Sequence, residues 1–264
     1  MIKTYGIPPC AVVAVHGGPG ARGSLGGFAR ELSLRSELCV AEPWQSEHSV
    51  SALVRELAEQ IESLSPPCPP DLVGHSWGAW LCLLLAAEYP HLAGKLILVG
   101  APPLEFSFVP QIAKRRRANL GKEDRARFSA LASRMEGKGK PLSDAELAEL
   151  GALAERADGV DLLPKEEEET LPDAEANALV WREAAALRES GELKRRISRV
   201  RNPVFVFQGD RDPHPFEGVA FPLSEMKLPL RSYVISACGH EPYRERRAAD
   251  VFYGFLCDIL HGEI

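Results

Sequence analysis

A serine lies between two glycines in the segment GHSWG at 74–78, which has the residue types and spacing of a nucleophile turn. A short strand-like run at 71–73 precedes this segment, and an apolar run at 80–87 follows it and predicts a buried helix. In such a strand–turn–helix the two glycines occupy corners that cannot hold a side chain, and the serine is raised above the sheet. The helix N-terminus behind it favours developing negative charge. The pattern predicts a nucleophilic Ser76.

A serine hydroxyl needs a base to take its proton, and the base needs a carboxylate to hold its orientation. His240 is the histidine that directly follows the last predicted strand. Asp210 and Asp212 both follow the strand before it, so either is a candidate for the carboxylate. His214 is close to Asp212 and is an alternative base. The chain order serine, acid, histidine agrees with one known arrangement of such triads.

Attack on a carbonyl also needs two N–H donors where negative charge develops. The residue after the nucleophile, Trp77, supplies the first. The second is expected from the loop HGGPG at 16–20, which follows a predicted strand. A glycine-rich loop can instead bind phosphate, but this loop lacks both the Lys-Ser/Thr of a P-loop and the spacing G-x-G-x-x-G. The loop therefore favours an oxyanion hole over a nucleotide site.

The elements that must position these residues alternate along the chain. Strands are predicted at 10–15, 38–41, 71–73, 96–99, 203–207 and 232–235. Helices are predicted at 25–34, 50–64, 80–87 and 245–260. Alternating strands and helices indicate an α/β fold, a mostly parallel sheet of about six strands with helices on both faces. The candidate residues then meet at the carboxyl edge of that sheet.

The segment 104–201 has a different pattern. It contains no convincing strand, and its amphipathic runs predict helices at 109–120, 123–136, 144–158 and 173–188. We therefore expect a core formed by 1–103 and 202–264, and a helical cap, 104–201, inserted over Ser76. Apolar residues of the cap, among them Phe106 and Trp181, are expected to line a substrate pocket.

The composition restricts the possible partners. The chain has 264 residues and a net charge of -6, which argues against nucleic acid as a partner. No apolar stretch is long enough to span a membrane, and the first nine residues do not resemble a signal peptide. The cysteines lack metal-ligand spacing, and Cys10, Cys39 and Cys82 fall in apolar elements. These features predict a cytoplasmic protein with reduced core thiols and without metal or cofactor.

HGGPG together with G-x-S-W-G resembles the proline iminopeptidase branch of the α/β-hydrolase family. The resemblance covers about 10–103 and 202–260, and it extends to GDRDP and CGHEP in the two later loops. It implies Asp212 rather than Asp210 as the acid, and Gly18, with Gly17 beside it, as the second oxyanion donor. Only nine residues precede the HGGPG strand, so the family's N-terminal antiparallel strands should be shortened or missing.

The resulting hypothesis is a serine hydrolase that cleaves an ester or amide of a small substrate through an acyl-Ser76 intermediate. One alternative is an aminopeptidase of the proline iminopeptidase type. In the enzymes of that type, cap glutamates bind the free amine, and Glu166 to Glu169 are the local candidates here. The alternative from another class is a non-catalytic binding protein on a hydrolase fold. The sequence carries no signal for the oligomeric state.

Overall fold

The protein is built around a seven-stranded, mostly parallel sheet in the order β1-β4-β2-β5-β6-β8-β9. This is a computed structural model, and it describes residues 1–165 and 171–264. The strands are β1 (Ile2–Tyr5), β2 (Cys10–Val15), β4 (Cys39–Pro43), β5 (Asp71–His75), β6 (Leu96–Val99), β8 (Val204–Gly209) and β9 (Leu230–Ile235). The predicted α/β sheet is confirmed, with one strand more than the six expected.

The additional strand is β1, which pairs antiparallel with β4 at the edge of the sheet. It is a single short strand, so the N-terminal antiparallel part is shortened and not missing. The remaining strand pairs of this sheet are parallel. Because they are parallel, the carboxyl ends of β5, β6, β8 and β9 meet at one edge of the sheet.

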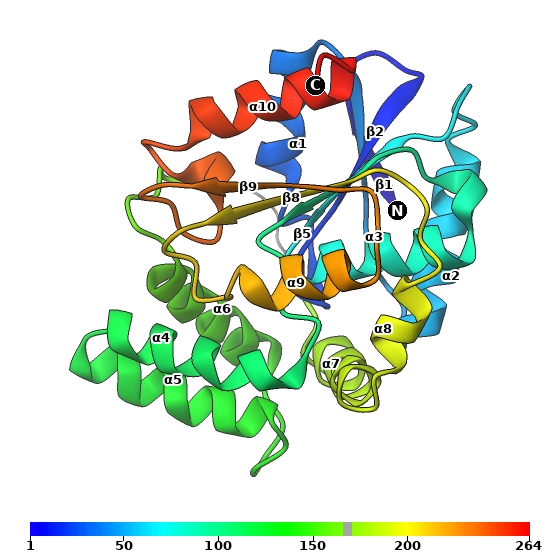
Figure 1. The fold of residues 1–264 in the computed structure, drawn as a ribbon. Helices are drawn as coiled ribbons and strands as arrows, with labels where there is room; N and C mark the ends of the chain where they lie inside the picture. The colour runs from blue at the N-terminus through cyan, green and yellow to red at the C-terminus, as the bar shows by residue number, and fades with distance from the viewer. Residues whose placement is uncertain (166–170) are drawn as a thin grey trace.

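Helices cover both faces of the sheet (Figure 1). On one face α1 (Gly26–Ser36) and α10 (Ala249–His261) pack together over an apolar layer. On the other face lie α2 (Val50–Ser63), α3 (Trp77–Glu88) and α9 (Glu217–Glu225). The helix after the serine is apolar on all sides because it is buried between the sheet and its neighbours.

Between β6 and β8 the chain forms a helical segment. Its helices are α4 (Val109–Asn119), α5 (Lys122–Met135), α6 (Asp144–Asp158), α7 (Ala174–Glu189) and α8 (Glu192–Ile197). Short 3-10 turns occur at Pro90–Leu92, Phe106–Phe108 and Pro242–Arg244. A capping box starts α6, because the Ser143 side chain accepts from the Glu146 N–H and the Glu146 carboxylate accepts from the Ser143 N–H.

The helical segment touches the core at a second, two-stranded sheet. There β3 (Ala21–Arg22), which follows the HGGPG loop, pairs antiparallel with β7 (Leu171–Pro172). The strand β7 lies within 104–201, where the sequence predicts helices only. In Figure 1, α4, α5 and α6 lie together at the lower left, and α7 lies below the sheet.

Two expectations about the chain as a whole can be compared with the structure. Cys10 and Cys39 are register partners in β2 and β4, with Cα atoms 4.3 Å apart, and they form a disulfide. The expectation that both are reduced is therefore wrong, because the parallel pairing places the two thiols side by side. Over the described residues, every helix is too short or too polar to cross a membrane.

Candidate active site at the carboxyl edge of the sheet

Ser76 occupies a sharp turn between β5 and α3. Its backbone angles are φ 52° and ψ -121°, a conformation that costs energy in a residue with a side chain. The flanking glycines are required by close approach. A Cβ at Gly78 would collide with the carbonyl oxygen of Val15, and one at Gly74 would lie 2.5 Å from that of Gly78. The turn is therefore held by β2 and α3 in the shape that raises the serine.

His240 and Asp212 come together from the loops after β9 and β8. The Nδ1 of His240 lies 2.8 Å from Oδ2 of Asp212, and both side chains are buried. Gly100, after β6, leaves room for the ring, since a Cβ there would lie 2.8 Å from His240 Nδ1. Ser76 and His240 line the same cavity, although Ser76 Oγ is without a hydrogen bond to the described residues.

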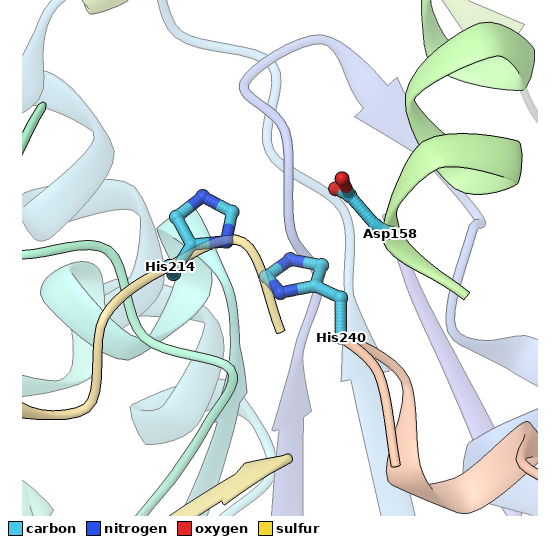
Figure 2. Close-up of side chains that lie close together, drawn as sticks. All are labelled: Asp158, His214 and His240. Atoms are coloured by element: carbon cyan, nitrogen blue, oxygen red, sulfur yellow. The ribbon is translucent and has the colours of Figure 1, made fainter. Parts of the chain in front are cut away.

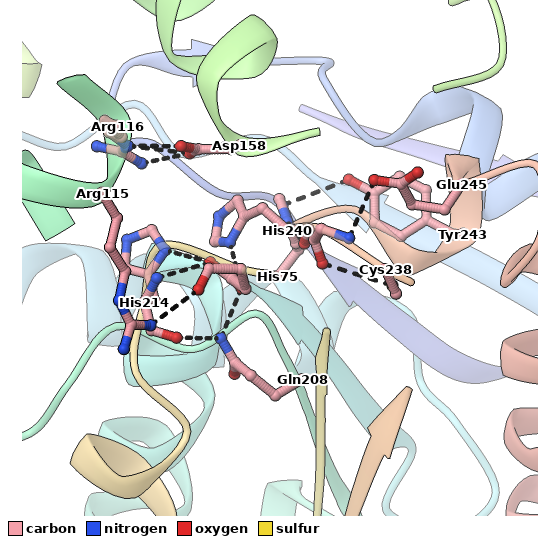
Figure 3. A network of polar contacts seen from close by, with 12 residues as sticks. His75, Arg115, Arg116, Asp158, Gln208, His214, Cys238, His240, Tyr243 and Glu245 are labelled. Atoms are coloured by element: carbon pink, nitrogen blue, oxygen red, sulfur yellow. Dashed lines mark hydrogen bonds and ion pairs between the residues drawn. The ribbon is translucent and has the colours of Figure 1, made fainter. Parts of the chain in front are cut away.

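Asp212 holds two imidazoles. Its second oxygen, Oδ1, accepts from Nδ1 of His214 at 2.9 Å and from the backbone N–H of the same residue at 2.8 Å. Gln208, at the end of β8, donates to Oδ2 at 2.6 Å. The two histidine rings are stacked with centroids 4.4 Å apart. The contacts of His214, His240 and Gln208 can be followed in Figure 3.

The sequence left His214 as an alternative base, and the structure places it on the same carboxylate as His240. Because both Nδ1 atoms donate to Asp212, the free ring nitrogen of each histidine is Nε2. Asp210 lies elsewhere: its carboxylate accepts from the Cys238 N–H at 3.2 Å and from the Ser236 hydroxyl at 3.3 Å. Asp210 thus supports the turn that leads to His240 without contacting its ring.

The buried charges shift the pKa values of this cluster. Burial alone would raise the pKa of Asp212, but the two histidines outweigh it and hold that pKa far below its ordinary value. Burial lowers the pKa of His240, yet the Asp212 carboxylate raises it above 6.5 overall. For His214, burial and the neighbouring His240 keep the pKa below its ordinary value. His240 is consequently the more basic imidazole of the pair.

His75 lies under His240, with its ring centroid 4.8 Å away. Its Nε2 donates to the His240 carbonyl at 3.2 Å, and its Nδ1 accepts from the Tyr243 hydroxyl at 3.4 Å. Burial and the proximity of His240 hold the pKa of His75 well below its ordinary value. A neutral His75 therefore supports the loop of His240 from below.

The loop 16–20 lies beside the serine. Gly17 and Gly18 line the cavity with Ser76, and a Cβ at Gly17 would lie 3.0 Å from the Ser76 Cβ. Gly18 has φ +53°, which favours glycine. Trp77 begins α3, so its N–H is among the first four of the helix, which lack a partner within it.

Gln45, which the sequence did not single out, connects this loop to Trp77. Its side-chain amide accepts from the Trp77 indole N–H at 2.9 Å and donates to the His16 carbonyl at 2.9 Å. Its backbone N–H donates to Nε2 of His16, whose Nδ1 donates to the Gly17 carbonyl. Burial lowers the pKa of His16 to about 4, so this histidine is neutral and structural.

A cavity of about 500 Å³ opens over Ser76, a size typical of small-molecule sites. It is lined by the core loops and by residues of α4, α5, α6 and α7. Trp181 lines it, and its ring lies 5.7 Å from that of Trp77. Phe106 is 52% exposed and is not among the lining residues, so its expected place in the pocket gains no support. Glu166 to Glu169 lie outside the described residues.

Asp158, at the end of α6, faces the two histidines (Figure 2). One carboxylate oxygen of Asp158 and one ring nitrogen each of His214 and His240 lie within 4.8 Å of one another, as the ligand atoms of a metal site would. Arg116 of α4, however, already binds the carboxylate, with Nε 2.7 Å from Oδ1 (Figure 3). Because a guanidinium neutralises the acid, the group fits a hydrogen-bonded charge network better than a cation site.

A buried carboxylate ties the end of α6 to the loop of His240. Glu245 accepts from the N–H groups of Val160 and Asp161, each at 2.8 Å, and from that of Gly239 at 3.0 Å. The N–H of His240 itself donates to the Asp158 carbonyl at 3.0 Å. No local sequence pattern indicates this role, since Val160 and Glu245 are 85 residues apart.

Comparison with known proteins places this geometry in a family. Residues 12–252 match the model described as "Alpha/beta hydrolase family". None of the curated proteins matches the chain. Among solved structures, VinJ has a TM-score of 0.66 at 17% identity, with 100% of this chain and 95% of VinJ covered. Proline iminopeptidase from Mycobacterium smegmatis has a TM-score of 0.63 at 16% identity, covering 99% and 94%.

A monoacylglycerol lipase from Paleococcus ferrophilus is similar to the same degree. Its TM-score is 0.62 at 18% identity, with 98% of this chain and 97% of the lipase covered. At such identities these three likenesses show a common fold and leave the substrate open.

Proposed function

Because the chain belongs to the alpha/beta hydrolase family, we propose that it is a serine hydrolase that cleaves a small ester or amide through an acyl-Ser76 intermediate. The observation that carries the proposal is the contact between His240 and Asp212 in a cavity that Ser76 also lines. His240 takes the Ser76 proton as the hydroxyl oxygen bonds to the carbonyl carbon. The leaving group departs with that proton, and water then releases the acyl group.

We assign the oxyanion hole to the N–H groups of Trp77 and Gly18, with Gly17 beside them. The support is their place around Ser76: one begins the helix behind it and the others line the cavity next to it. Gln45 is a positioning residue, since it links the His16 end of the loop to the Trp77 side chain.

We further propose that 104–201 acts as the cap that selects the substrate. Its helices supply much of the cavity wall, including Trp181. For the type of substrate we prefer an ester to a peptide with a free amine. The described carboxylates of the cap and His240 loop that line the cavity, Glu155, Asp158 and Glu241, are each paired with an arginine. The proline iminopeptidase alternative therefore keeps the motif resemblance as its support.

The test is labelling with a fluorophosphonate, followed by a screen of p-nitrophenyl esters and proline amides. We expect labelling in the wild type and none in Ser76→Ala, with a loss of turnover of about 10⁴-fold or more. The unlabelled but folded variant, checked by circular dichroism, is the control. Equal labelling or turnover in Ser76→Ala would refute the nucleophile, and a wild type without either would favour the non-catalytic alternative.

A further inference from the structure

One part of the cavity is lined by apolar residues of two helices of the cap. Leu147, Gly151 and Ala154 of α6 line it, and their spacing places them on one face of that helix. Phe128, Ala132 and Met135 of α5 line it with the same spacing. We call these six residues the apolar slot.

The slot has a measurable direction and length. At the carboxyl end of the same α6 face lies Asp158, whose carbonyl accepts from the His240 N–H. Leu147 precedes Asp158 by eleven positions, so at 1.5 Å per residue the two lie about 16 Å apart along the helix axis. Gly151 and Met135 are exposed, so the slot is an open groove along the two helices, and a Cβ at Gly151 would meet no atom within 4 Å.

The end of the slot carries a polar group that points to a ligand. His214 is only 6% exposed, lines the cavity and uses Nδ1 on Asp212. Its Nε2 is without a hydrogen-bond partner among the residues that the structure describes, and it can accept a hydroxyl hydrogen. The slot therefore combines an apolar groove with a hydrogen-bond acceptor beside the base, and the Arg116–Asp158 ion pair lines the cavity near the histidines. This arrangement suits a molecule with one hydroxyl and one alkyl chain.

We infer that the slot binds an unbranched alkyl chain on the leaving-group side of the substrate, so that the preferred substrates are esters of medium-chain alcohols. This inference rests on the proposed function. In the acylation step the Ser76 Oγ–C bond forms and the C–O bond to the alcohol breaks. His240 passes the serine proton to the departing oxygen. The departing oxygen must lie next to His240, and the slot begins at that point.

Two series of substrates test the assignment. The first series keeps the acyl group and lengthens the alcohol, from ethyl to butyl, hexyl and octyl acetate. The second keeps the p-nitrophenyl leaving group and lengthens the acyl chain. We expect kcat/KM to rise about fourfold per added methylene in the first series and much less in the second. A rise confined to the second series would overturn the leaving-group assignment, and a flat response in both would overturn the slot.

Gly151→Leu should fill the slot, and Ala145→Leu is the matched control, because it adds a side chain to an exposed position of the same helix away from the cavity. We expect Gly151→Leu to lower kcat/KM about tenfold or more for octyl acetate and to leave ethyl acetate unchanged. Gly151→Ala, which raises helix propensity with little added volume, should behave as the wild type. Loss on both esters alike, or equal loss in Ala145→Leu, would contradict the slot.

Binding of 1-octanol to Ser76→Ala, measured by calorimetry, tests the slot without catalysis. We expect binding that Gly151→Leu abolishes and Ala145→Leu retains. If 1-octanol binds but fluorophosphonate does not label the wild type, the slot stands and the hydrolase proposal fails. If labelling occurs but 1-octanol does not bind, the slot fails and the hydrolase proposal stands.

Discussion

The sheet and the helices α4 to α6 are buried to very different degrees. Every residue of β8 is buried, and so is nearly every residue of β2 and β5. In α4, whose residues are all described, none is buried, and the apolar cluster around α5 and α6 has only six buried members. A region packed on all sides fixes positions, whereas a thinly packed one tolerates change. In our proposal the packed sheet edge carries the chemistry and the helices select the substrate.

The largest effect short of removing the nucleophile should come from the carboxylate held at the sheet edge. Asp212→Asn removes the charge and replaces one of the two oxygens that accept from the imidazoles by an NH₂ donor, and we expect kcat to fall about 10⁴-fold. Asp210→Asn is the matched control in the same loop. It weakens hydrogen bonds of a turn, which costs about 1 kcal/mol, so the loss should be less than about tenfold. Steady-state kinetics on one ester compares the two, and the reverse ranking would show that the wrong aspartate is assigned.

A smaller effect should appear in the pH profile. His240 acts as a base only when unprotonated, and Asp212 raises its pKa above 6.5. We expect kcat/KM to fall as pH drops below that pKa, by about tenfold per pH unit. In Asp212→Asn the raising charge is gone and burial remains, so the acidic limb should move to lower pH. Fluorophosphonate labelling rates between pH 5 and 9 measure the acidic limb even in a slow variant. A limb at the same pH in Asp212→Asn would show that a group other than His240 causes it.

The smallest effect should come from the helical segment. Ser143→Ala removes the N-cap of α6, and we expect a loss of about 1 kcal/mol in the free energy of unfolding of that segment. Labelling of Ser76 should be unchanged. Ser129→Ala, in the middle of α5, is the control, because its hydroxyl only bonds back to the Arg125 carbonyl. Urea denaturation followed by circular dichroism provides the measurement. A parallel loss of Ser76 labelling would contradict the independence of the helices from the sheet edge.

Sequence patterns were most informative where local physics dominates. The β-branched run Cys10–Val15 and the run Leu96–Val99 became strands with the predicted bounds, and the helix predicted at 144–158 is α6 with the same bounds. The strand β1 was missed because it is a short, partly exposed edge strand. The helix α9 was missed because it contains Pro222, and proline disfavours a helix interior; tertiary packing holds the helix in spite of it.

For the candidate site, the sequence pattern indicated Ser76 and His240 because each follows a strand in a recognisable loop, and the family resemblance indicated Asp212 over Asp210. The sequence could not name Gln45, Glu245 or the pair of Arg116 with Asp158. These residues act through partners 29 to 85 positions away, and such contacts leave no local pattern. That Asp212 binds two histidines could be predicted in part, since His214 is only two residues away in the sequence.

The clamp that Glu245 forms between α6 and the His240 loop has a consequence for protein engineering. An exchange of the whole segment 104–201 with that of another enzyme would remove Val160 and Asp161, whose N–H groups Glu245 binds. The base would then lose the anchor of its loop along with the old specificity. A chimera that crosses over before Glu155 would keep the Asp158 carbonyl and the clamp, and would exchange α4, α5 and most of α6, including Arg116. The useful module boundary thus lies inside a helix and not at the ends of the insertion.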